Sequence, residues 1–153
     1  MLYAPQTMRL APIEEHEYYA EALPQPSVMI IDDSPTVRAV IEASLRRHGF
    51  RITSFGDGLA AMGALARGEV EVPHLLLLDL GLPRMDGYEV ARILRSKADF
   101  GQTTLVMLTA HDGMLDRLRG KLVGASEYIT KPFNVRYVVD VVRSYLHQTP
   151  QPQ

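Results

Sequence analysis

Short apolar runs alternate with longer segments of helical periodicity along most of the chain. This alternation is typical of βα units and predicts a parallel sheet covered by helices. The third run, Leu75 to Leu78, is apolar throughout and should be central, whereas Arg51 to Phe55 alternates apolar and polar residues and suits an edge. Five strands are expected, at Val28 to Ile31, Ile52 to Phe55, Leu75 to Leu78, Leu105 to Leu108 and Glu127 to Ile129.

Five helices should connect and follow these strands. The first is the best marked, because Ser34 can cap its N-terminus, Pro35 suits its first turn and Gly49 ends it. Its apolar positions are Val37, Val40, Ile41 and Leu45. The other helices are expected at 57–67, 87–97, 112–122 and from Asn134 onward. One face of the last helix carries Val135, Val138, Val139, Val142 and Leu146.

The two ends of the chain differ from the segment between them. Residues 1–27 contain four prolines and carry four glutamates against one arginine, and residues 149–153 contain two prolines. Proline at this spacing interrupts regular structure, so we interpret 1–27 as a flexible extension or docking arm and 149–153 as a tail. Residues 28–148 then form one domain with a single core.

Composition narrows the classes of function. A formal net charge of −2 provides no field that would attract nucleic acid or an anionic membrane surface. The absence of cysteine excludes disulfides, thiolate metal sites and a cysteine nucleophile. No apolar run reaches the length of a membrane helix, and the N-terminus lacks the apolar core of a signal peptide. A cytoplasmic location is therefore expected.

Chemically active side chains gather where the expected strands end. In open parallel sheets, ligands bind beyond the carboxyl ends of the strands. Here these ends carry Asp32 and Asp33, then Asp79, then Thr109, then Lys131. The alternative is that the acids only solvate loops and cap helices, but such residues would then be scattered along the strands.

Three carboxylates at one edge of a sheet need a cation. Each pair repels by roughly 4 kcal/mol at an effective dielectric of about 20. Oxygen ligands favour Mg²⁺ over Zn²⁺, and phosphate oxygens commonly complete the shell of such an ion. An aspartate can act as a nucleophile and form an aspartyl phosphate, while the metal and a lysine neutralise the charge in transit. Thr109 would then donate its hydroxyl to a phosphate oxygen.

Four motifs occur in the order and spacing of a known family. They are an acidic pair, a nine-residue stretch after the third strand, a Thr-Ala pair and a Lys-Pro-Phe triplet. With them, residues 28 to about 147 resemble the receiver domain of two-component response regulators, in the stand-alone form of chemotaxis regulators. The motifs are Asp32-Asp33, Asp79-Leu80-Gly81-Leu82-Pro83-Arg84-Met85-Asp86-Gly87, Thr109-Ala110 and Lys131-Pro132-Phe133.

The resemblance implies a flavodoxin-like, doubly wound α/β sheet of order 2-1-3-4-5 with five helices. It implies that Asp79 accepts a phosphoryl group from a histidine kinase or a histidine phosphotransfer protein. Lys131 would pair with the phosphoryl oxygens, and Thr109 and Tyr128 would form the switch that responds. The Lys131–Pro132 peptide bond is expected to be cis. Mg²⁺ would be bound by the side chains of Asp33 and Asp79, by the backbone carbonyl of Gly81 and, often through water, by Asp32.

No output domain is expected after the last helix, so the signal would pass by contact with another protein. The last two helices and the last strand would form the contact face, and whether that face serves another protein or a second copy of the chain stays open. Tyr137, Val141 and Tyr145 are spaced four residues apart and would form an exposed stripe there. By analogy with the family, Arg38 on the first helix would lie on the side where the kinase docks.

Several interpretations stay open. Gly81 lies two residues after Asp79, and His111 lies two residues after Thr109. Both are hypothesised to control how water reaches the phosphoryl group. Tyr128 is alternatively a half-buried aromatic residue on an edge strand. The chain is not expected to be an enzyme, because a Mg²⁺-dependent aspartyl-phosphate phosphohydrolase would carry an aspartate at position 81 and usually a cap domain. The other rival is a receiver-fold module that binds partners without phosphorylation.

Overall fold

The computed structural model describes residues 25–110, 119, 121 and 123–146. Within these residues, five strands form one parallel sheet in the order β2-β1-β3-β4-β5. This order confirms the doubly wound arrangement, with β3 at the centre and β2 at an edge. The strands are β1 (Ser27–Ile31), β2 (Arg51–Phe55), β3 (Leu75–Asp79), β4 (Thr104–Thr109) and β5 (Ala125–Thr130).

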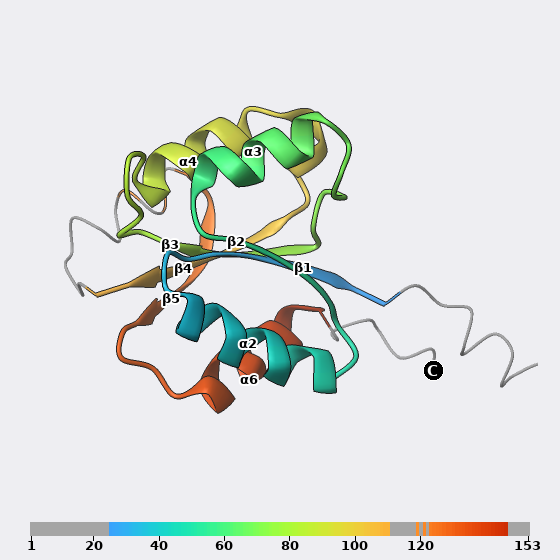
Figure 1. Ribbon diagram of the computed structural model, residues 1–153, viewed down its shortest axis with the longest axis vertical. Coiled ribbons are helices and arrows are strands. Elements are labelled where there is room, and N and C mark those ends of the chain that lie inside the picture. Colours follow the sequence, from blue (N-terminus) through green and yellow to red (C-terminus); the bar gives the residue numbers. More distant parts are fainter. Residues whose placement is uncertain (1–24, 111–118, 120, 122, 147–153) are drawn as a thin grey trace, which may run out of the picture.

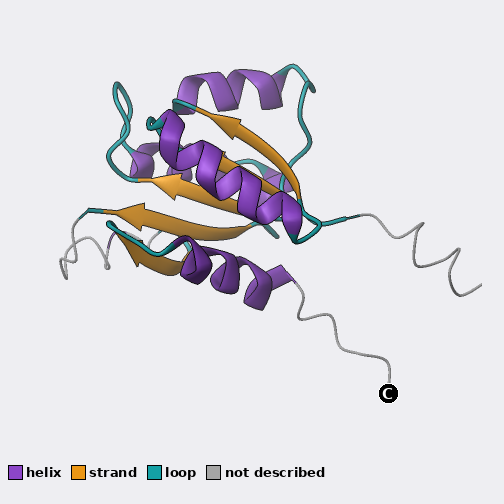
Figure 2. Ribbon diagram, turned by 60° about the horizontal axis from the view of Figure 1, so that its bottom comes forward, coloured by secondary structure: helices purple, strands orange, loops and turns teal. Residues whose placement is uncertain are grey.

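Helices cover both faces of the sheet. They are α2 (Pro35–Arg47), α3 (Gly58–Ala66), α4 (Gly87–Arg95) and α6 (Val135–Leu146), with a short 3-10 helix, η2 (Ala98–Phe100). Figure 1 shows α3 and α4 on one face and α2 and α6 on the other. Figure 2 shows from a second direction how the strands run side by side between the helices. The sheet therefore has a buried apolar core on each side.

Alternate side chains of each strand fill the two cores. In β1, Val28 and Ile30 pack with residues of α2 and α6, whereas Met29 and Ile31 pack with residues of α3 and α4. Side chains of successive strand residues point to opposite faces, so a strand covered on both faces must be apolar throughout. The same rule explains why β3 continues as an unbroken run of leucines until Asp79.

Local sequence signals set where the helices near the carboxyl edge of the sheet begin. The Ser34 hydroxyl accepts a hydrogen bond from the backbone nitrogen of Val37 at 3.2 Å, and Pro35 occupies the first helical position of α2. Asp86 caps α4 in the same way, with a carboxylate oxygen 2.9 Å from the backbone nitrogen of Glu89. The Ser34 cap confirms the predicted start of α2.

Two apolar positions were assigned to the wrong face. Val40, expected on the buried face of α2, is 44% exposed, because that face is centred on Ile41, Ser44 and Leu45 and leaves Val40 at its flank. Val141, expected in the exposed stripe of α6, is buried in the core beneath that helix. The stripe therefore reduces to Tyr137 and Tyr145.

Other expectations differ in extent or fall outside the described residues. α4 ends at Arg95 rather than at residue 97, and η2 follows it. Of the expected helix at 112–122, the described residues are 119 and 121, and both are helical. Residue 123, just after the expected end, is not helical. The rest of 112–122, His111 and the segments 1–24 and 147–153 lie outside the described residues. None of the helices in the described part of the chain has the length and apolar character that a membrane span requires.

Candidate functional site

The carboxyl edge of the sheet brings together the side chains that the sequence placed at the strand ends. Asp32 directly follows β1, and Lys131 directly follows β5. Asp79 and Thr109 are the last residues of the neighbouring strands β3 and β4. A pocket of about 300 Å³ opens here, lined by Asp79, Leu80, Gly81, Tyr88, Thr109, Ala110 and Lys131. We refer to it below as the Asp79 pocket.

Lys131 forms ion pairs with two of the three aspartates. Its Nζ atom donates a hydrogen bond to Oδ2 of Asp32 at 2.7 Å and lies 3.4 Å from Oδ2 of Asp79. Burial alone would lower the pKa of Lys131, but hydrogen bonds and charge interactions with the two carboxylates raise it above its ordinary value. The lysine is therefore cationic at neutral pH. The Lys131–Pro132 peptide bond is cis, as expected.

Asp32 is completely buried and held by several donors. Its Oδ1 atom accepts a hydrogen bond from the backbone nitrogen of Ser34 at 2.9 Å, while Oδ2 accepts from Lys131. Arg38 of α2 donates from Nη1 to the Asp32 backbone carbonyl at 2.5 Å. Arg38 therefore fastens α2 to the end of β1, a contact that the sequence did not predict.

Asp79 is also buried, but its carboxylate faces the pocket. Oδ1 accepts a hydrogen bond from the backbone nitrogen of Gly81 at 2.9 Å. Burial is the main cause of a raised pKa for Asp79, and the negative charge of Asp32 adds to it; the Gly81 hydrogen bond and Lys131 act in the opposite direction. The carboxylate is therefore more basic than that of an exposed aspartate.

Three carboxylates converge closely enough to share one cation. Asp32, Asp33 and Asp79 each offer an oxygen, and these atoms lie within 4.8 Å of one another. Asp33 is exposed, whereas the other two are buried. An all-oxygen, strongly negative donor set fits a hard divalent cation, so these residues fit Mg²⁺. A contribution from the Gly81 backbone carbonyl stays a prediction.

The two expected switch residues occupy different surroundings. Thr109 is buried and lines the Asp79 pocket. Tyr128 of β5 is half-buried against the core beneath α3 and α4 and is not among the residues that line the pocket. This placement matches the open alternative of a half-buried aromatic residue on an edge strand. A switching role for Tyr128 stays a prediction.

Tyr88 lines the pocket, although no sequence pattern singled it out. It is the second residue of α4 and is 8% exposed. α4 begins so close to β3 that a Cβ atom on Gly87 would lie 2.5 Å from the backbone oxygen of Asp79. This close approach brings the next residue, Tyr88, into the lining of the Asp79 pocket. The glycine before Tyr88 is the one sequence signal that could have indicated it.

The comparison with protein families matches most of the chain. Residues 28–143 match the response regulator receiver domain. Protein PilG of Pseudomonas aeruginosa is 31% identical over 119 residues, which cover 78% of this chain and 86% of PilG. The chain spans about half the length of several other curated relatives.

Solved structures share the fold. The chemotaxis response regulator CheY4 of Vibrio cholerae has a TM-score of 0.71 and 26% identity, over 80% of this chain and 100% of that one. The receiver domain of sensor histidine kinase PA1611 of Pseudomonas aeruginosa, solved with a magnesium ion in its active site cleft, has a TM-score of 0.68 and 27% identity, over 82% and 100%. The chain therefore belongs to the response regulator receiver domain family of two-component systems.

Proposed function

We propose that this receiver accepts a phosphoryl group on Asp79 from a histidine kinase or a histidine phosphotransfer protein, and responds by changing a protein-binding surface. The observation that carries the proposal is the position of Asp79. Its carboxylate ends the central strand, faces a pocket and lies 3.4 Å from the Lys131 ammonium. Membership of the receiver family supports the same role, because receivers act in phosphorylation-based signalling.

Transfer to Asp79 is a displacement at phosphorus. An Asp79 carboxylate oxygen forms a bond to the phosphorus, and the bond between the phosphorus and the donor's histidine nitrogen breaks. The electron pair of the broken bond stays on the imidazole, and the product is an aspartyl phosphate. The raised pKa of Asp79 supports this role, because a more basic oxygen is a better nucleophile.

Groups around Asp79 would offset the charge of the incoming phosphoryl group. Lys131 is already within ion-pair distance of Asp79 and would bind a phosphoryl oxygen, while the Thr109 hydroxyl would donate to another. Mg²⁺ would be held by Asp32, Asp33, Asp79 and the Gly81 carbonyl. When bound, Mg²⁺ supplies the positive charge that stabilises phosphoryl oxygens. The receiver would thus catalyse only its own phosphotransfer and autodephosphorylation.

The responding surface is proposed to include α6, β5 and the helix before β5. Tyr137 and Tyr145 of α6 are exposed, and the Tyr145 hydroxyl donates to the backbone oxygen of Ser126 in β5 at 3.1 Å. Thr109 pairs in register with β5, so its movement toward a phosphoryl group would reach the strand that carries Tyr128. A downstream protein would bind this face, and its use in a homodimer stays a prediction.

We further propose that the receiver domain spans residues 28–148, with 1–27 as an N-terminal extension and 149–153 as a tail. The family match over residues 28–143 supports these bounds. A stand-alone arrangement and a cytoplasmic location stay predictions from the sequence.

Incubation with acetyl phosphate and Mg²⁺ separates this function from its rivals. The intact-mass spectrum should show one added phosphoryl group, which hydroxylamine removes, and Asp79→Asn should show none. Repeated turnover of a phosphate ester would instead indicate a phosphohydrolase. No adduct, under conditions that phosphorylate a control receiver, would favour a module that binds partners without phosphorylation.

A further inference from the structure

Tyr88 separates the Asp79 pocket from a second, adjoining pocket. The second pocket has a volume of about 260 Å³ and is lined by Asp86, Tyr88, Glu89, Arg92, Arg119 and Val123. Tyr88 belongs to the lining of both pockets, and only 8% of it is exposed. Its side chain therefore forms a wall between the Asp79 pocket and the space beside Arg119.

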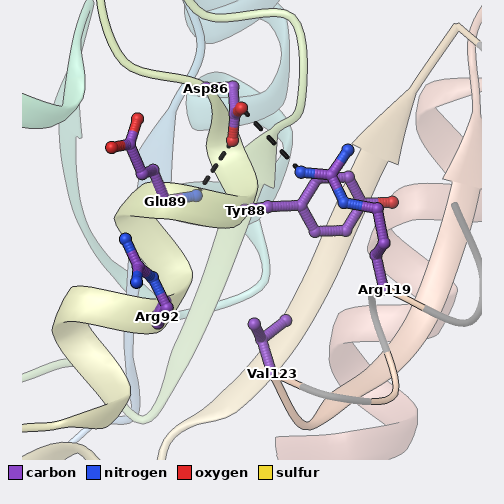
Figure 3. Close-up of a pocket in the computed structure, with 6 residues that line it drawn as sticks. All are labelled: Asp86, Tyr88, Glu89, Arg92, Arg119 and Val123. Atoms are coloured by element: carbon purple, nitrogen blue, oxygen red, sulfur yellow. Dashed lines mark hydrogen bonds and ion pairs between the residues drawn. The ribbon is translucent and has the colours of Figure 1, made fainter.

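Arg119 packs against this wall from the side of the second pocket. Its guanidinium carbon lies 4.1 Å from the centroid of the Tyr88 ring, which is the geometry of a cation–π contact. Figure 3 shows the guanidinium over the ring and directed toward Asp86, with which it forms an ion pair at 4.0 Å. The other carboxylate oxygen of Asp86 accepts the hydrogen bond from Glu89 that caps α4. Arg119 thus contacts the start of α4 twice, through the Tyr88 ring and through the Asp86 carboxylate.

The backbone on the other side of Tyr88 leaves little room for movement. A Cβ atom on Gly87 would lie 2.5 Å from the Asp79 backbone oxygen and 2.8 Å from the Leu80 Cα atom. The Gly87 backbone nitrogen also donates to the Leu80 carbonyl at 3.3 Å. Since the backbone is packed against β3 at this point, rotation of the Tyr88 side chain is the movement that would open the wall. The stacked guanidinium of Arg119 opposes that rotation.

We propose that Arg119 is a positioning residue for the phosphoryl chemistry of Asp79: it holds Tyr88 as a closed wall and so prolongs the life of the aspartyl phosphate. The inference rests on the proposed function. In hydrolysis, a water oxygen bonds to phosphorus, the bond from phosphorus to the Asp79 oxygen breaks, and the products are the Asp79 carboxylate and inorganic phosphate, which carries both protons of the water. The closed wall removes one route for water, the route from the second pocket, and leaves the mouth of the Asp79 pocket as the other.

The half-life of the aspartyl phosphate tests this proposal. Full-length protein is labelled with radioactive acetyl phosphate and Mg²⁺, freed of the donor, and followed by the loss of protein-bound label. Arg119→Ala and Tyr88→Leu should each shorten the half-life by about twofold to fivefold, the range expected for the loss of one cation–π contact.

A double variant shows whether Arg119 acts through the ring. Arg119→Ala combined with Tyr88→Leu should decay no faster than Tyr88→Leu alone, because the ring that Arg119 holds is already absent. Arg92→Ala is the matched control, since Arg92 lines the same second pocket from α4 and should leave the half-life unchanged. The side chain of Arg119 is 49% exposed, so its removal leaves the core intact.

Three outcomes would overturn the proposal. They are a wild-type half-life in Arg119→Ala, additive effects in the double variant, or an equal shortening in Arg92→Ala. A wild-type protein that takes up no label would overturn the proposed function itself and this inference with it. If the wild type is labelled normally but the variants lose the label at the wild-type rate, the proposed function stands and only this inference fails.

Discussion

Lys131 and Asp32 lie 99 positions apart in the sequence, and their side chains meet at 2.7 Å. The pair joins the segment after β5 to the end of β1, past the intervening strands β3 and β4. The Asp32 side chain is completely buried, whereas the Lys131 side chain is 24% exposed. Lys131 therefore compensates the charge of a buried carboxylate.

Replacement of Lys131 by methionine should destabilise the fold. Methionine retains much of the side-chain length but leaves the buried Asp32 carboxylate without its cation. Removal of one partner from a buried ion pair costs several kcal/mol, and the partial exposure of Lys131 reduces the expected loss to about 2 kcal/mol. Urea unfolding at pH 7 measures this loss. Lys97→Met, at an exposed lysine, is the matched control, and equal stability of the two variants would contradict the prediction.

The ionised carboxylate of Asp79 should lower the free energy of unfolding at neutral pH when Mg²⁺ is absent. Burial and the charge of Asp32 raise the pKa of Asp79 above its ordinary value of 3.8, so the folded state binds this proton more tightly than the unfolded state. The free energy of unfolding therefore falls as pH rises from 3.8 through the raised pKa. Asp79→Asn should be more stable than wild type at pH 7, with the difference shrinking toward zero in acid.

Urea titrations in EDTA at a series of pH values measure this difference. Asp99→Asn, at an exposed aspartate in η2, controls for the general loss of one negative charge. A stability gain in Asp79→Asn that is the same at every pH would show that the titration of Asp79 is not its cause.

Mg²⁺ should stabilise the folded protein through the three converging aspartates. A ligand that binds only the folded state adds about 2.7 kcal/mol at a concentration 100 times its Kd. Asp33→Asn removes the exposed carboxylate and leaves the Asp32–Lys131 pair in place, so it should reduce the rise of Tm with Mg²⁺ concentration. Thermal unfolding with added Mg²⁺ or EDTA measures the effect, again with Asp99→Asn as the control. An undiminished rise in Asp33→Asn would exclude this residue as a ligand.

The strand ends could be predicted from the sequence because an apolar run that stops at a charged residue is a local signal. Asp79 follows four buried leucines, and Asp32 follows a run that is apolar on both faces of the sheet. The parallel sheet then brings such ends together, whichever residues lie between them. The strand order itself came from the family resemblance rather than from periodicity.

Other features depend on packing that no local pattern encodes. Helical spacing predicts which residues share a face, but the width of the buried stripe depends on the helix packed against it, and Val141 was misplaced for that reason. Tyr88 reaches the Asp79 pocket because Gly87 allows α4 to approach β3. The Arg119 contact needs two segments distant in sequence to pack together.

The close approach at Gly87 leads to a prediction on stability. In Gly87→Ala the new methyl group would lie 2.5 Å from the Asp79 backbone oxygen, so α4 must shift away from β3. Overpacking of this kind costs roughly 1–3 kcal/mol. Gly101→Ala is the matched control, since its Cβ atom would meet no atom closer than 3.5 Å. Urea unfolding of both variants checks the prediction, and equal stabilities would contradict the geometry at Gly87.

The most direct test of the account asks which residue carries the phosphoryl group. Borohydride reduces an aspartyl phosphate to homoserine, so peptide mass spectrometry after reduction of the phosphorylated protein identifies the acceptor. The account predicts homoserine at position 79, dependent on Mg²⁺, and unmodified Asp32 and Asp33. Homoserine at position 32 or 33, or an intact Asp79 in protein that carries a phosphoryl group, would contradict it.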